Sequence, residues 1–267
     1  HSCTLHRRNA NPKAKMDRPP TSKRTRYPGI TADARSLGVH RTTLYKMLRG
    51  TDYVFLRPWD EAAFLASPRS AENRPADKLK PDGNRAVMLC TTTDAYQAVR
   101  DPELQAHLRM MVRRSLELIR DHSSINVRIL TRSPLVRQDF ELLSSLGPRV
   151  MLGMSIPTLR NDLARVYEPS APAPTQRLRV LQEAAKLGIP TFVAVAPVFP
   201  ECDEADVRQT LKAVADAGVW TVFAEPVNIR AENVARIEAH AASRGIRLNT
   251  SVFKDGESWQ RYAIDTL

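Results

Sequence analysis

Polar side chains that could bind a ligand follow five successive apolar runs of this sequence, each at the point where a run ends. They are hydroxyls, carboxylates and guanidinium groups in segments 91–94, 131–133, 155–158, 201–203 and 225–230. In parallel α/β folds the carboxyl ends of the strands form the ligand-binding face. Helix capping and loop solubility could account for one or two such clusters, but five in succession indicate a polar binding site.

The apolar runs have the length and β-branched content of strands, and longer amphipathic segments separate them. The predicted strands cover residues 86–90, 127–130, 150–154, 191–196, 220–224 and 246–252, and the predicted helices 102–122, 135–146, 175–187, 204–217 and 231–243. Glycines 147, 188, 218 and 245 follow four of these helices, where a helix C-cap is expected. Alternating strands and helices predict an α/β fold, with about six parallel strands curved into a partial or complete (β/α) barrel.

Five short motifs at these strand ends are similar to those of one protein family and occur in the family's order. They read TTTDAYQ at 91–97, ILTRS at 129–133, GMSIPT at 153–158, YEPSAPAPTQRL at 167–178 and APVFP at 196–200. With these motifs the chain resembles the radical S-adenosylmethionine (SAM) proteins of the spore photoproduct lyase, or DNA repair photolyase-like, group. The resemblance implies a partial barrel of radical SAM type, lyase chemistry in DNA repair, and SAM and a [4Fe–4S] cluster as cofactors.

The resemblance also implies which residues would contact the methionyl end of SAM. Thr93 and Asp94 match the family segment that meets the amino and carboxylate groups, and Arg132 matches the basic residue that pairs with the carboxylate. Ser155 matches a hydroxyl that holds the ribose or the methionyl portion. These residue types suit a zwitterion, which needs both a cation and hydrogen-bond acceptors.

Two further pairs of residues complete the implied SAM site. Ala196 and Pro197 match a backbone segment that lies along the adenine. Glu168 and Arg177 fall at positions typical of substrate or SAM contacts. The residues themselves leave an alternative open, since Glu168 could instead be a capping carboxylate and Arg177 an exposed helix residue.

The cysteines depart from the family pattern. The family binds its cluster through a Cys-x3-Cys-x2-Cys loop, and no such triplet occurs among Cys3, Cys90 and Cys202. We therefore expect an incomplete or degenerate relative that cannot bind the cluster by itself, and whether the chain is an enzyme stays open. Cys90 could donate a hydrogen atom, as a cysteine near this position does in some relatives, or serve as a small buried hydrophobe.

Most of the net charge of +11 lies in the first 50 residues, which hold 12 Lys/Arg and 2 Asp/Glu. Residues 1–28 read as a flexible basic arm, and residues 30–50 resemble the helix-turn-helix of DNA-binding regulators, with Ala34 and Gly38 in its skeleton. On its outer face this module would present His40, Arg41, Thr42, Tyr45, Lys46 and Arg49. The alternatives are a nucleic-acid-binding module joined to a non-catalytic barrel, or a helical hairpin that only packs on its neighbour. We divide the chain into this module, a connector over 51–85 with one short helix at 61–66, and a barrel over 86–267.

The remaining composition narrows the class of protein. No apolar run approaches the roughly 18 residues that a membrane helix needs, and three scattered cysteines fit a reducing compartment. We therefore expect a soluble cytoplasmic protein without a membrane partner. A metal-dependent hydrolase or lyase is the least favoured alternative, because the six histidines fall mainly on predicted helices or in the arm.

Overall fold

The computed structural model describes residues 59–75, 78, 85–89, 94–219, 221–229 and 233–266. They form two compact units, one of residues 59–74 with 98–123 and one of the others. The positions of Cys3, Cys90, Thr93 and the six predicted DNA-contacting residues, His40, Arg41, Thr42, Tyr45, Lys46 and Arg49, lie outside the described residues.

The first unit is built from two helices, α3 (Glu61–Glu72) and α4 (Pro102–His122). The predicted bounds of α4 are confirmed, since Asp101 caps the helix by accepting hydrogen bonds from the backbone of Glu103 and Leu104. An ion pair between Arg114 and Glu61, with Nε and Oε1 2.6 Å apart, links the two helices. Among the residues that the structure describes, no helix combines the length and apolar character of a transmembrane span.

The second unit contains a five-stranded sheet whose strands are all parallel and follow one another in chain order. The strands are β1 (Ala86–Leu89), β2 (Asn126–Thr131), β3 (Val150–Ser155), β4 (Thr191–Val198) and β5 (Thr221–Pro226). Its helices are η3 (Pro134–Asp139), α5 (Phe140–Ser145), η4 (Gly147–Arg149), α6 (Asn161–Tyr167), α7 (Pro174–Lys186), α8 (Glu204–Asp216), α9 (Asn233–Ala242), η5 (Thr250–Phe253) and α10 (Gly256–Thr266). The predicted α/β fold and five of the predicted strands are confirmed, and closure into a barrel remains a prediction.

The sixth predicted strand, at residues 246–252, is wrong. The chain there enters η5, and Val252 and Phe253 pack against a cluster that includes Phe199 and Tyr262. The apolar residues of this segment are therefore partly buried by tertiary contacts with the C-terminal helix rather than by strand pairing. Helices α6 and α10 were not predicted.

The helices end where the sequence predicts glycine C-caps. Each of the four glycines predicted as C-caps has a positive φ, from 56° at Gly147 to 83° at Gly218. A side chain would be strained in that conformation, so these glycines stop the helices, and Gly147, Gly188 and Gly218 do so shortly before the next strand.

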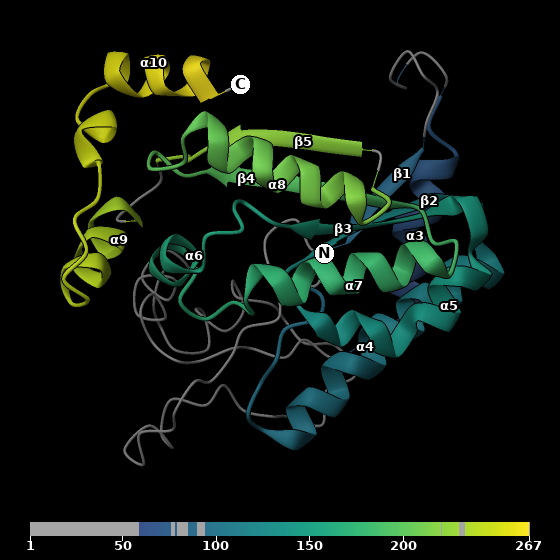
Figure 1. Cartoon of the computed structure of the whole chain (residues 1–267). Coiled ribbons are helices and arrows are strands. Elements are labelled where there is room, and N and C mark those ends of the chain that lie inside the picture. Colours follow the sequence, from purple (N-terminus) through teal and green to yellow (C-terminus); the bar gives the residue numbers. More distant parts are fainter. Residues whose placement is uncertain are drawn as a thin grey trace, which may run out of the picture. The chain divides into compact units, whose positions relative to one another are not determined.

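The core lies between the sheet and the helices that cover it. Helix α7 packs on β3 and β4 (Figure 1). Val180, Leu181 and Ala184 of α7 are fully buried, as are Leu152 and Met154 of β3. Because all five strands run the same way, their carboxyl ends lie along one edge of the sheet, which is where the predicted site residues belong.

Gly153 on β3 has a packing role that allows a test of the core. A Cβ atom built at Gly153 would lie 2.1 Å from Cζ of Phe192 on β4, far inside van der Waals contact. We expect Gly153→Ala to lower the free energy of unfolding by about 1–3 kcal/mol, as overpacking does. Urea unfolding followed by circular dichroism measures the loss.

Two further variants control that experiment. Gly256→Ala should leave the free energy of unfolding almost unchanged, because an added Cβ there meets nothing within 4 Å. Adding Phe192→Leu to Gly153→Ala should cost less than the sum of the two single changes, since it removes the clashing ring atoms. Strict additivity would contradict the proposed clash.

The C-terminal helix is tied to the ends of β4 and β5 by the hydroxyl of Tyr262. This hydroxyl donates to the carbonyl of Val198 and accepts from the backbone N–H of Val227, which lies 3.0 Å away. Trp259 adds a second tie, because its Nε1 donates to the carbonyl of Val227 at 2.7 Å. The segment after β5 therefore closes this end of the sheet unit through hydrogen bonds to backbone.

Burial raises the pKa of Tyr262 to about 12, above its ordinary value of 10.0. The unfolded chain loses this proton first, so the stability that protonated Tyr262 contributes is complete below pH 10 and is lost as the pH rises through about 12. We expect Tyr262→Phe to be less stable by about 1–3 kcal/mol at pH 9, because two backbone groups lose their partner. By pH 11 the gap to wild type should narrow by on the order of 1 kcal/mol. A gap that does not change in urea titrations at the two pH values would contradict this role.

Candidate functional site

Asp94, just beyond β1, binds the end of the neighbouring strand β2. Its Oδ1 accepts hydrogen bonds from Oγ1 of Thr131 at 2.6 Å and from the backbone N–H of Tyr96 at 2.9 Å. Its Oδ2 accepts from the backbone N–H of Arg132 at 2.8 Å. The carboxylate thus joins two strand ends, as their parallel alignment predicts.

The side chain of Arg132 extends the network to Glu168, in the loop after α6. Nε of Arg132 lies 2.5 Å from Oε1 of Glu168, and Nη1 of Arg177 lies 2.6 Å from Oε2 of the same carboxylate. The contact with Arg177 is an ion pair without hydrogen-bond geometry. The side chain of Glu168 is 8% exposed, so this nearly buried carboxylate lies between two guanidinium groups.

Arg177 is the most deeply buried residue of the network. Its exposed fraction is 0%, which excludes the alternative of an exposed helix residue. From α7 its Nε donates to the carbonyl of Pro172 and its Nη1 to the carbonyl of Ser155, each at 2.8 Å. Burial lowers the pKa of Arg177 while the Glu168 carboxylate opposes this, and the guanidinium stays protonated because its ordinary pKa is so high.

Ser155 carries the network on to β4. Its Oγ donates to the carbonyl of Ala196 at 2.9 Å, and the following Ala196–Pro197 peptide bond is cis. Ser155 is 1% exposed, whereas Ala196 and Pro197 are partly exposed. Ser155 therefore positions the β4 end and does not itself face solvent.

Seven of the eight predicted SAM-contacting residues are described, and hydrogen bonds or ion pairs join Asp94, Arg132, Ser155, Glu168, Arg177 and Ala196 in one network. Pro197 follows Ala196 directly, and Thr93 lies outside the described residues. The side chain of Arg132 is 42% exposed and only its Nε has a partner among the residues that the structure describes. The site thus has two parts. The partly exposed rim consists of Asp94, Arg132, Ala196 and Pro197, and the buried support consists of Ser155, Glu168 and Arg177.

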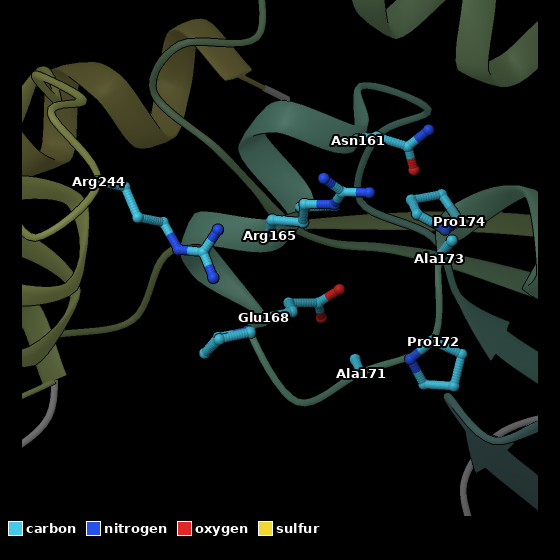
Figure 2. A pocket seen from close by; sticks show the side chains of 10 residues that line it. Asn161, Arg165, Glu168, Ala171, Pro172, Ala173, Pro174 and Arg244 are labelled. Carbon is cyan, nitrogen blue, oxygen red and sulfur yellow. The ribbon is translucent and has the colours of Figure 1, made fainter.

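Sequence reasoning missed Thr131 and the residues around Glu168. Thr131 was visible only as a hydroxyl at a strand end, and its bond to Asp94 fixes that carboxylate. Arg165 and Arg244 line a pocket beside Glu168, shown in Figure 2, and no motif marks either residue.

The described residues do not fit a three-thiolate cluster. Cys202 is the cysteine among them, and burial raises the pKa of its thiol above the ordinary value, which disfavours the thiolate that binds iron. Within the described ranges, no group of three or more His, Cys, Asp or Glu side chains could hold a metal ion.

Comparison with known proteins shows what this chain is similar to. No family profile matches the chain. It is 34% identical over 194 residues to an uncharacterized protein of Acidianus two-tailed virus, covering 70% of this chain and 60% of that protein. It is 23% identical over 116 residues to an uncharacterized protein of Methanocaldococcus jannaschii, covering 43% and 41%. The chain thus spans three fifths or less of the length of these relatives.

Solved structures of spore photoproduct lyase have the same fold. One complexed with dinucleoside spore photoproduct has a TM-score of 0.57 and 15% identity, over 78% of this chain and 58% of that one. A variant of that enzyme with bound AdoMet and dinucleoside spore photoproduct has a TM-score of 0.55 and 15% identity, over 84% and 69%. The described part of the chain therefore has an α/β fold similar to that of spore photoproduct lyase.

Proposed function

We propose that this chain is a SAM-binding protein related to spore photoproduct lyase and the DNA repair photolyase-like enzymes. The observation that carries the proposal is the network from Asp94 through Arg132 and Glu168 to Arg177, Ser155 and Ala196. It ties four strand ends together and leaves the Nη groups of Arg132 available for a carboxylate. The two carboxylates and two guanidinium groups balance in charge, so a zwitterionic methionyl group would not disturb that balance.

Each end of the methionyl group has a partner in this proposal. The carboxylate of SAM pairs with the Nη groups of Arg132, whose planar fork suits two oxygens. The ammonium group donates to Asp94, which uses three of its roughly four acceptor positions in the contacts described above. Ala196 and Pro197 lie along the adenine, and Ser155, Glu168 and Arg177 hold these groups in place.

A bound SAM next to a reduced [4Fe–4S] cluster supplies radical chemistry, but this sequence lacks the cysteine triplet that would bind the cluster. We therefore propose that the chain binds SAM and does not bind the cluster by itself, as an incomplete or degenerate relative would. Lyase activity and DNA repair would require the cluster from elsewhere.

Two measurements on the full chain test the proposal. Isothermal titration calorimetry with SAM should show saturable binding to one site per chain, with S-adenosylhomocysteine as competitor. The absence of saturable binding would overturn SAM binding. Incubation with iron and sulfide under anaerobic conditions should leave the protein without a thiolate-to-iron absorption band. A stable brown protein would overturn the proposal that the chain does not bind the cluster by itself, and would leave the proposal of SAM binding intact.

A second candidate function is nucleic-acid binding through residues 1–50, supported by their 12 Lys/Arg against 2 Asp/Glu and by the helix-turn-helix resemblance. Binding to duplex DNA should weaken as salt rises, because phosphate contacts release counterions. Replacing Arg41, Lys46 and Arg49 by glutamine in the full chain should weaken binding and flatten its salt dependence. Unchanged binding and an unchanged slope would contradict this role.

A further inference from the structure

A pocket of about 380 Å³ lies beside the candidate site, between α6, the loop after it, the start of α7 and Arg244. Three prolines and three alanines form most of its wall, and its polar side chains are Asn161, Arg165, Glu168 and Arg244. In Figure 2, Arg165 and Glu168 extend from α6 and the following loop toward Pro172 and Pro174, while Arg244 reaches in from the other side. This volume is sufficient for a small organic ligand.

The pocket carries an excess of positive charge. Its one carboxylate, Glu168, is already paired with Arg132 and Arg177. Arg165 and Arg244 have no carboxylate within ion-pairing distance in the part of the chain that the structure describes. Two uncompensated guanidinium groups around one concave surface attract an anion.

One of these guanidinium groups is held in place by a neighbour. Nε of Arg244 donates to Nε2 of His240 at 3.0 Å, and the same ring nitrogen lies 3.2 Å from the carbonyl of Arg165. The Nε of Arg244 is therefore engaged, and its two Nη groups remain as a fork of donors. Helix α9 contacts α6, so Arg165 and Arg244 line the same pocket although they are far apart in the sequence.

We propose that this pocket binds a phosphate monoester, with the phosphoryl group between Arg165 and Arg244. A single guanidinium already satisfies the two oxygens of a carboxylate, whereas the three terminal oxygens of a phosphoryl group can bridge two guanidinium groups from different elements. The organic part of the ligand lies against the prolines and alanines, which offer apolar contact. Arg165, Arg244 and the proline wall do not belong to the proposed SAM rim, so this site stands or falls independently of SAM binding.

The test uses the full chain at low ionic strength and titration calorimetry with inorganic phosphate and with phenyl phosphate. We expect both to bind, and phenyl phosphate to bind more tightly because its ring contacts the wall. Arg165→Gln and Arg244→Gln should each weaken the binding of both probes at least tenfold, since each removes charge-assisted hydrogen bonds to the phosphoryl group. Any phosphate binding to the basic residues 1–50 is common to all variants and cancels in the comparison.

The control is Arg179→Gln, which removes an exposed arginine of α7 that does not line the pocket. It should leave both affinities unchanged. The proposal is overturned if neither probe binds, if Arg179→Gln weakens binding as much as the pocket variants do, or if acetate competes as well as phosphate. It is also overturned if phenyl phosphate binds no more tightly than inorganic phosphate, because the wall would then contribute nothing.

Discussion

Arg177→Met is expected to lower the free energy of unfolding by about 3–5 kcal/mol, the usual cost of removing one partner from a buried ion pair. The change leaves Glu168, at 8% exposure, with Arg132 as its remaining cation. It also removes the donors to the carbonyls of Pro172 and Ser155, so the loop before α7 and the end of β3 lose their common tie. Urea unfolding at neutral pH measures the loss.

Two variants decide whether the buried pair causes that loss. Arg179→Met changes an exposed arginine of the same helix and should alter the free energy of unfolding by less than about 0.5 kcal/mol. The double variant Arg177→Met with Glu168→Leu removes both charges of the pair. Its loss of unfolding free energy should be smaller than the sum of the two single losses, because neither member of the pair is then left charged without the other. Equal losses for Arg177→Met and Arg179→Met would show that the buried contacts contribute little.

The parts of the fold that the sequence predicted well depend on local signals. Helix α4 has a capping aspartate at Asp101 and a proline in its first turn, and its bounds were predicted correctly. Glycines after helices predicted four C-caps because few other residues adopt a positive φ. The gathering of Asp94, Arg132 and Ser155 at one edge followed from a single topological argument, that parallel strands share their carboxyl edge.

The parts that failed depend on contacts between distant segments. The residues of the false sixth strand have strand-like composition, but Val252 and Phe253 pack against the cluster of Tyr262 and Phe199, which no local pattern reveals. The burial of Arg177 was equally hidden, because arginine is rarely buried without a partner and that partner, Glu168, comes from the preceding loop. Arg165 and Arg244 line one pocket only because α6 contacts α9. Helix amphipathicity cannot predict such convergence.

The largest expected effect on ligand binding belongs to Arg132. Arg132→Gln should weaken SAM binding by about 10- to 100-fold, because it removes charge-assisted hydrogen bonds worth about 1.5–3 kcal/mol from the methionyl carboxylate. Arg132→Lys keeps the charge but loses the planar fork, so its affinity should fall between those of wild type and Arg132→Gln. Titration calorimetry with SAM measures all three affinities.

Arg137→Gln is the matched control for this prediction. Arg137 is 37% exposed against 42% for Arg132, and its Nε likewise pairs with a glutamate, Glu183. That pair lies on the exposed surface and does not belong to the site network, so its loss should leave SAM affinity unchanged and cost little stability. If Arg137→Gln weakens SAM binding as much as Arg132→Gln does, the loss of affinity comes from the change in overall charge and not from the site. If neither variant changes the affinity, SAM does not bind at the Arg132 guanidinium, and the proposed orientation of its methionyl group is wrong.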